Sequence, residues 1–174
     1  MNRALIILFS FLFSHCKPDK DEFVKSEFSG YNQKIEMYVP DSLKLYSYDT
    51  IGSGLEKAIS YSYIYINDLK LNINFKHIDS NTFDIKVFFD NCINRQNALN
   101  VNTVWLEKSI ITSNNHDIGL LEYSSKSFKA EGYIIQAYIE ENGILITVTY
   151  QFIGRKEDLE MDLFQSIKTV KILH

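Results

Sequence analysis

Several stretches of this sequence contain side chains that could take part in catalysis or in binding a metal ion. Ser53 lies in IGSGLEK, which is neither the GxSxG nucleophile elbow nor the GxxxxGK[ST] phosphate loop, so a turn is the better prediction. DSNTFD, beginning at Asp79, starts like a calcium loop. However, Asp84 stands where that loop needs glycine and Phe83 takes a ligand position. This stretch therefore predicts a helix cap.

Histidine and cysteine supply the remaining candidates for chemistry. His116 beside Asp117 suits acid–base work, but the histidines lie far apart and form no HExxH motif, so a solvated loop is the better prediction. Cys92 lies on an apolar stripe without a partner cysteine, which predicts a buried core thiol rather than a nucleophile. The sequence therefore predicts no catalytic residue, no metal ligand and no cofactor.

The second cysteine, Cys16, lies where an apolar stretch meets a charged one, in FSHCKPDKDE. Residues 4–13 are apolar apart from Ser10, and they follow a positive charge at Arg3. A membrane span needs about 20 apolar residues, so this shorter run is typical of an export signal instead.

The residues just before Cys16 resemble a bacterial lipoprotein signal, in which a Leu and two small residues precede the cysteine. Ser14 fits this pattern, whereas Phe13 replaces the usual Leu and His15 the usual Gly or Ala. The resemblance implies cleavage before Cys16 and acylation there by two or more chains, because one chain anchors only marginally. Since Lys17 rather than Asp follows, it also implies the outer membrane, on its periplasmic or surface side. A plain secreted protein and an uncleaved membrane anchor are the alternatives.

These features divide the chain into a signal at residues 1–15, a flexible tether at 16–32 and one domain at 33–174. Without the signal, the 18 basic residues lose Arg3 and face 22 acidic ones, which gives a net charge of −5. The sequence has no basic run, so nucleic acid is a poor partner. We expect two partners instead, the membrane through the acyl chains and an unidentified protein.

A first hairpin is predicted in AISYSYIYINDLKLNINFK. A two-residue turn at Asn67-Asp68 would pair Ile66 with Leu69, and Ile64 with Leu71, on the core face. The other face then carries the candidate partner-binding strip, which consists of Tyr61, Tyr63, Tyr65, Lys70 and Lys76. Either the closing helix covers these tyrosines, or they form an exposed aromatic strip suited to a protein or glycan interface.

A second hairpin is predicted in GYIIQAYIEENGILITVTYQF, where Asn142-Gly143 tolerates the positive φ angles of a type I′ turn. Pairing outward from this turn sets Ile139 against Ile146 and Tyr133 against Phe152. A further strand is expected at residues 34–40, with Ile35, Met37 and Val39 on one side. Two more are expected at residues 103–112 and 118–125.

Two segments predict helices. Residues 81–96 combine helical and alternating spacing of apolar residues, and we interpret them as a helix capped near Asp79-Ser80. After Gly154, one face of an amphipathic helix would carry Leu159, Leu163, Ile167 and Val170. Strands outnumber helices and the local links are hairpins, so the predicted fold class is α+β, an antiparallel β-sheet packed with two main helices.

The strand ending in IEMYVP, the late hairpin and the closing DLFQSIKTVKI resemble the PsbP-like fold, which includes small bacterial lipoproteins of the DcrB type. The resemblance implies an α/β/α sandwich and a mostly non-enzymatic group, and it assigns no functional residue. The leading hypothesis is a lipid-anchored, non-enzymatic binding or assembly protein of the cell envelope. An immunity-type inhibitor of a periplasmic toxin is the second hypothesis, and a small hydrolase using Ser53 or His116 is the third.

Overall fold

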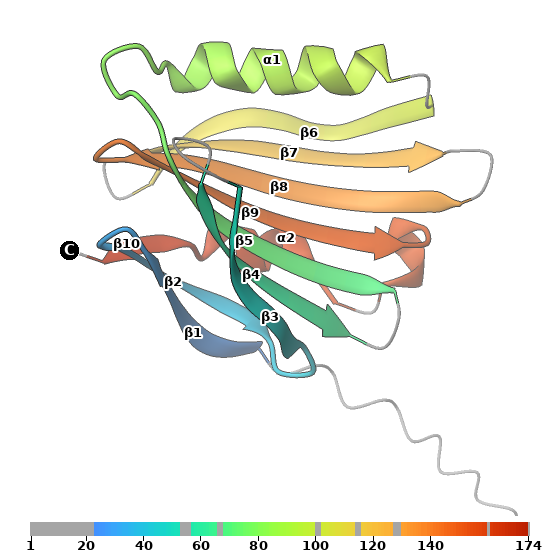
Figure 1. The fold of residues 1–174 in the computed structure, drawn as a ribbon. Helices are drawn as coiled ribbons and strands as arrows, with labels where there is room; N and C mark the ends of the chain where they lie inside the picture. Colours follow the sequence, from blue (N-terminus) through green and yellow to red (C-terminus); the bar gives the residue numbers. More distant parts are fainter. Residues whose placement is uncertain are drawn as a thin grey trace, which may run out of the picture.

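The computed structural model describes residues 23–52, 57–65, 68–99, 102–113, 116–126, 130–159 and 161–173 (Figure 1). These residues form two antiparallel sheets and two α-helices. The smaller sheet has the order β1-β2-β10, with β1 (Phe23–Gly30), β2 (Gln33–Pro40) and β10 (Lys171–Leu173). The larger, seven-stranded sheet has the order β3-β4-β5-β9-β8-β7-β6.

The strands of the larger sheet are β3 (Lys44–Ile51), β4 (Ala58–Tyr65), β5 (Leu69–His77), β6 (Asn102–Ser113), β7 (His116–Lys126), β8 (Glu131–Glu141) and β9 (Ile144–Ile153). The helices are α1 (Ile85–Ala98) and α2 (Leu163–Lys168), and a 3₁₀ turn, η2, covers Lys156–Asp158. Every strand pair in both sheets is antiparallel, so the predicted α+β class is confirmed.

The main core lies between the two sheets. Alternate residues of the central strands point to this side, and Leu71 and Val148 are fully buried there. Ile35 and Met37 of β2 and Ile167 of α2 pack into the same cluster. The smaller sheet and α2 thus cover one face of the larger sheet, and the predicted inward face of β2 is confirmed.

The helix α1 packs on the opposite face of the larger sheet, over β6, β7 and β8 (Figure 1). Phe89 approaches the backbone of β7 so closely that a Cβ added at Gly119 would lie 2.8 Å from its ring. The rings of Phe88 and Tyr138 meet edge to face, with centroids 5.3 Å apart. These contacts place α1 over the β6 end of the sheet, away from β3, β4 and β5.

Part of the tether predicted at residues 16–32 is wrong, because residues 23–30 form β1 and pair with β2 along their whole length. The turn between the two strands uses Tyr31 and Asn32, whose φ angles are 51° and 64°. Tyrosine is rare at such an angle, so this hairpin lacks the usual sequence signal. The Tyr31 ring lies 4.1 Å from that of His77, a contact that helps to hold the turn.

The register of the β4–β5 hairpin differs from the prediction by one residue. Tyr63 pairs with Leu71, whereas the prediction paired Ile64 with Leu71. Because side chains alternate along a strand, a slip of one residue moves every β4 side chain to the other face of the sheet. Tyr61 and Tyr63 therefore lie on the core side, and Ile64 lies on the other side.

The helix predicted at residues 81–96 is confirmed as α1, but it begins later than predicted. The carboxylate of Asp84 accepts hydrogen bonds from the backbone N–H groups of Lys86 and Val87, so Asp84 is the cap. Asp79 instead accepts a bond from the N–H of Asn81, in the turn before the helix.

The closing helix is much shorter than predicted. The hydroxyl of Thr169 donates to the carbonyl oxygen of Ser166 at 2.6 Å and accepts from the N–H of Tyr38 at 3.0 Å. These bonds end α2 and direct the chain into β10, which pairs with β2. A side chain that bonds to a neighbouring strand thus overrides the helical pattern of the sequence.

Candidate functional site

The structure separates the residues predicted as one partner-binding strip. Tyr61 and Tyr63 lie half-buried on the core side, whereas Lys70 and Lys76 lie on the opposite face, so the prediction of a shared face is wrong. Tyr65 pairs with Leu69, and its side chain lies outside the described residues. Two further residues of the sequence analysis, Cys16 and Ser53, also lie outside them.

Tyr61 joins the smaller sheet to the larger one. Its ring centroid lies 5.5 Å from that of Phe28 on β1 and 4.7 Å from that of Tyr48 on β3. Its hydroxyl donates a hydrogen bond of 2.8 Å to the carbonyl oxygen of Ser29. The side chain thus has a packing role, and the strand β1 covers it rather than the closing helix.

Tyr63 is covered in the same way. Its ring meets that of Phe28 edge to face at 5.8 Å, and burial raises the pKa of its phenol. A raised pKa keeps the phenol neutral, which suits a side chain packed against a hydrophobic core.

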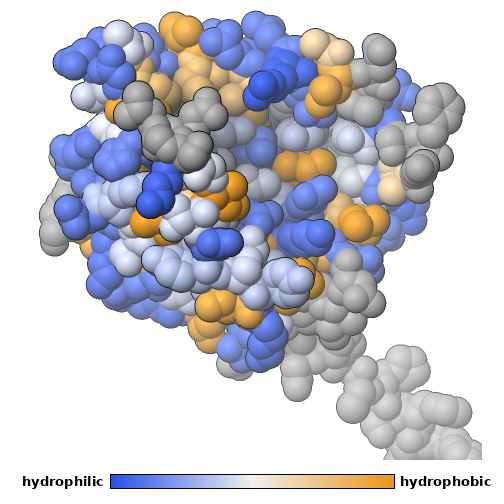
Figure 2. All heavy atoms as spheres, in the orientation of Figure 1, coloured by the Kyte–Doolittle hydropathy of each residue, from blue (hydrophilic) through white to orange (hydrophobic). Residues whose placement is uncertain are grey.

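The face that carries Lys70 and Lys76 is polar across several strands. We name it the open polar face, and it consists of Ser47, Ser62, Lys70, Asn72, Asn74, Lys76, Thr147 and Thr149. Ser47, Ser62, Asn72 and Thr149 lie opposite one another across β3, β4, β5 and β9, and Ser62 donates to Asn72 at 2.9 Å. In Figure 2, hydrophilic and intermediate residues dominate the area below α1, with hydrophobic residues as separate spots.

The edge strand β3 exposes large apolar side chains that the sequence analysis missed. We name them the β3 edge patch, with exposed fractions of 53% for Leu45, 74% for Tyr46, 59% for Tyr48 and 57% for Ile51. Among the described strands, β3 pairs only with β4, and a bulge interrupts its register between Leu45 and Ser47. The apolar and aromatic run KLYSYDTI was the signal for this strand.

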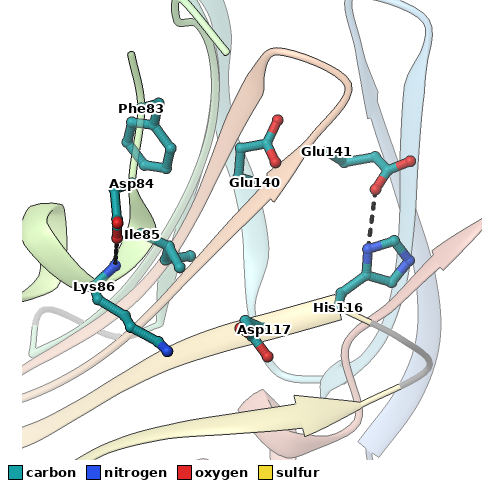
Figure 3. Close-up of a pocket in the computed structure, with 8 residues that line it drawn as sticks. All are labelled: Phe83, Asp84, Ile85, Lys86, His116, Asp117, Glu140 and Glu141. Carbon is teal, nitrogen blue, oxygen red and sulfur yellow. Dashed lines mark hydrogen bonds and ion pairs between the residues drawn. The ribbon is translucent and has the colours of Figure 1, made fainter. Parts of the chain in front are cut away.

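A pocket of about 610 Å³ lies where β7 and β8 meet the start of α1 (Figure 3). His116 and Asp117 come from β7, and Glu140 and Glu141 from β8, with Lys86 of α1 opposite them. The Nδ1 atom of His116 lies 3.0 Å from a carboxylate oxygen of Glu141. His116 is a residue of this pocket and not of a solvated loop.

The acidic residues of this pocket have local structural partners. Glu140 accepts the N–H of Gly143, and Glu141 accepts the side-chain amide of Asn142. The hydroxyl of Thr112 donates to Asp117 at 2.8 Å, and Asp84, also in the lining, caps α1. A histidine beside a carboxylate could act as a base, but the described residues that line the pocket include no Ser, Thr or Cys nucleophile.

A buried carboxylate lies on the other side of the sheet. Glu122 is 4% exposed, accepts the hydroxyl of Tyr133 at 2.6 Å and lies 2.5 Å from the ammonium of Lys156. Burial, and then the bond to Glu122, raise the pKa of the Tyr133 phenol. The ion pair fastens η2 to the sheet beside a second pocket of about 380 Å³.

Cys92 of α1 is half-buried rather than fully buried. Its neighbours include Phe89 and Tyr138, and burial raises the pKa of its thiol although a hydrogen bond with Tyr138 lowers it. A raised pKa leaves little thiolate near neutral pH, so this environment favours a packing role over a nucleophilic one.

Comparisons with known proteins concern the fold. No protein-family model and no curated protein matches the sequence. The structure is similar to cyanobacterial PsbP (CyanoP) from Synechocystis, at 12% identity and a TM-score of 0.55, over 86% of this chain and 92% of that one. The fold is PsbP-like. It is also similar to LpqN of Mycobacterium tuberculosis, at 12% identity and a TM-score of 0.53, over 88% of this chain and 92% of that one.

No helix among the described residues is long and apolar enough to cross a membrane. No group of three or more His, Cys, Asp or Glu side chains in the described part of the chain could hold a metal ion.

Proposed function

We propose that this protein is a lipid-anchored, non-enzymatic binding protein of the bacterial cell envelope, acylated at Cys16, which holds a protein partner on its open polar face. One observation carries the proposal. Among the described residues, α1 packs over β6, β7 and β8, and the strands beyond it present aligned, short polar side chains on the same face. Such groups can exchange hydrogen bonds with water for hydrogen bonds with another protein.

The proposal is non-enzymatic because the carboxylates that could act in catalysis already bond to other parts of the protein. In the large pocket, Asp84 caps α1, Glu140 and Glu141 bond to residues of the β8–β9 turn, and Asp117 accepts the hydroxyl of Thr112. Glu122 bonds to Tyr133 and Lys156. A catalytic carboxylate or histidine needs a free side towards a substrate, whereas these groups are committed to the fold.

The location rests on the sequence before the domain and on one similar structure. The segment that ends at Cys16 resembles a lipoprotein signal. LpqN, which shares the fold, is described as involved in cell envelope biogenesis. Both support an envelope protein whose domain stays close to the membrane.

The partner-binding surface is tested by placing a large charged side chain on it. Asn72→Arg should strongly reduce crosslinked recovery of the partner from native envelopes, because the added side chain blocks a flat surface. Val87→Arg is the matched control, because Val87 is 58% exposed on α1 and lies outside the open polar face. Equal recovery of every protein with wild type and Asn72→Arg would refute this surface.

The anchor is tested separately. Cys16→Ala should abolish detergent-phase partitioning and leave an uncleaved precursor, because acylation precedes cleavage in proteins with such a signal. A Cys16→Ala protein that still matures and stays membrane-bound would contradict acylation and favour another form of anchoring.

A further inference from the structure

Large exposed apolar side chains are concentrated on one strand of the described chain. The β3 edge patch places four of them, exposed by 53–74%, on a strand of eight residues. Isolated exposed apolar residues need no explanation, but a cluster of this density marks contact with another protein or with a membrane.

The patch projects from both sides of the sheet. Leu45 and Tyr48 pair with tyrosines of β4 on the core side, whereas Ile51 pairs with Ala58 on the side of the open polar face. One partner lying flat against either face would therefore miss part of the patch. A surface that meets the sheet along its edge would contact all of it.

The backbone of β3 disfavours another β-strand as that partner. The bulge at Tyr46 interrupts the regular spacing of N–H and C=O groups that an added strand, from a second copy or another protein, would need. A hydrated headgroup layer requires no such spacing, because water and headgroups can bond to an irregular edge.

The start of β1 lies near the start of β3, which places the β3 edge near the proposed anchor at Cys16. Phe23 pairs with Pro40 at the end of β2, and β3 begins shortly afterwards at Lys44. Residues 17–22 separate Cys16 from Phe23, and a fully extended chain of this length reaches about 25 Å. An acylated Cys16 would hold Phe23 within that distance of the lipid, and the start of β3 follows four residues after Pro40, the partner of Phe23.

The chemistry of the patch suits the membrane interface without requiring a charged lipid. Tyrosine places an apolar ring in the lipid and its hydroxyl among the headgroups. The charged residues that flank the start of β3 and of β5 are balanced, with Asp41 and Asp68 against Lys44 and Lys70. Binding should therefore depend little on salt.

We infer that the β3 edge patch rests in the headgroup layer of the membrane, with the seven-stranded sheet standing on this edge. The inference rests on the proposed anchor at Cys16. Neighbouring strands lie about 4.8 Å apart, so β6, at the opposite end of the sheet with α1, lies roughly 30 Å from the surface (Figure 1). The open polar face then stands upright, accessible to a partner beside the protein.

Fluorescence quenching by lipid tests this orientation. Tyr46→Trp and the control Leu106→Trp are compared in a Trp105→Phe, Cys92→Ser background, coupled through Cys16 to a maleimide lipid in phosphatidylethanolamine–phosphatidylglycerol vesicles. Tyr46 and Leu106 are matched, because both are exposed bulge positions of the two edge strands. Headgroup nitroxide lipids should quench the Tyr46→Trp variant several-fold more than the Leu106→Trp variant, and equal quenching would overturn the inference.

Hydrogen exchange supplies a second measurement that leaves Trp105 and Tyr46 in place. In the coupled chain, amides of β3 should exchange more slowly with vesicles than without them, while those of β6 should not change; unchanged exchange in β3 would overturn the inference. Chemical coupling makes this outcome independent of natural acylation. A wild-type chain that fails to partition into detergent would refute the proposed anchor alone.

Discussion

Two hairpins lie side by side in the seven-stranded sheet, because β5 pairs with β9, yet they close in different ways. The β8–β9 hairpin turns at Asn142 and Gly143, whose φ angles are 50° and 76°. In β4–β5 the last pair is Tyr65 with Leu69, so residues 66–68 connect the strands. The turn defines the register of the β8–β9 hairpin, whereas neighbouring elements define the register of the β4–β5 hairpin.

The difference shows when a local pattern is sufficient. In β8–β9 the turn residues accept positive φ and the alternating apolar residues agree with the turn, so both signals give the same pairing. In β4, tyrosines alternate with Ile and Ser, and tyrosine fits either a core or a surface. Phe28, which lies on a different sheet, decides between the two registers by packing on Tyr61 and Tyr63.

The largest expected effect concerns the tyrosines of β8–β9. Burial raises the phenol pKa of Tyr133, Tyr138 and Tyr150 above the ordinary value near 10. The stability that these buried phenols contribute is fully present below the phenol pKa of the unfolded chain. It is lost as pH rises above that value, because only the phenols of the unfolded chain can then ionise. Urea unfolding should show about 4 kcal/mol less stability at about pH 11 than at about pH 9, roughly 1.4 kcal/mol for each phenol.

The control for this prediction removes one phenol. Tyr138→Phe should lose about 1.4 kcal/mol less than wild type over the same pH interval, since Tyr138 is 6% exposed and the phenylalanine that replaces it cannot ionise. An identical pH dependence of the two proteins would show that this hairpin does not exclude the phenolate.

The next effect tests the register of β4–β5. Tyr61→Ala should lower the free energy of unfolding by about 2–3 kcal/mol, because it removes the ring contacts with Phe28 and the bond to Ser29. Ile64→Ala should cost less than about 1 kcal/mol, because Ile64 pairs with Lys70 on the open side. Thermal melting measures the loss of stability in each variant. If Ile64 pointed into the core, Ile64→Ala would lose more stability than Tyr61→Ala.

The smallest effect tests the turn of β8–β9. Gly143→Ala should cost about 1–2 kcal/mol, because a Cβ strains a residue at a φ of 76°. Gly132→Ala, also in this hairpin, should change stability by less than about 0.5 kcal/mol, since its Cβ would meet only ordinary contacts of 3.6 Å or more. Equal melting temperatures of the two variants would mean that the turn does not fix the register.

The candidate sites show the same limit of local pattern. The sequence identified His116 and Asp117 as neighbours, but the relevant partner, Glu141, belongs to β8 and reaches His116 only through the β7–β8 pairing. Similarly, no local pattern shows that Lys70 and Lys76 lie on a different face of the sheet from Tyr61 and Tyr63. Their separation onto two faces follows from the register, which depends on β1.

Elements whose signals lie within a few residues follow from the local sequence alone. These are the β8–β9 turn, the inward face of β2 and the existence of α1, because turn angles and side-chain alternation are local properties. Contacts between residues far apart in the chain instead account for the formation of β1, the register of β4, the early end of α2 and the exposure of β3. Each depends on a distant contact, such as Tyr31 on His77 or Thr169 on Tyr38, which no local spacing of residues encodes.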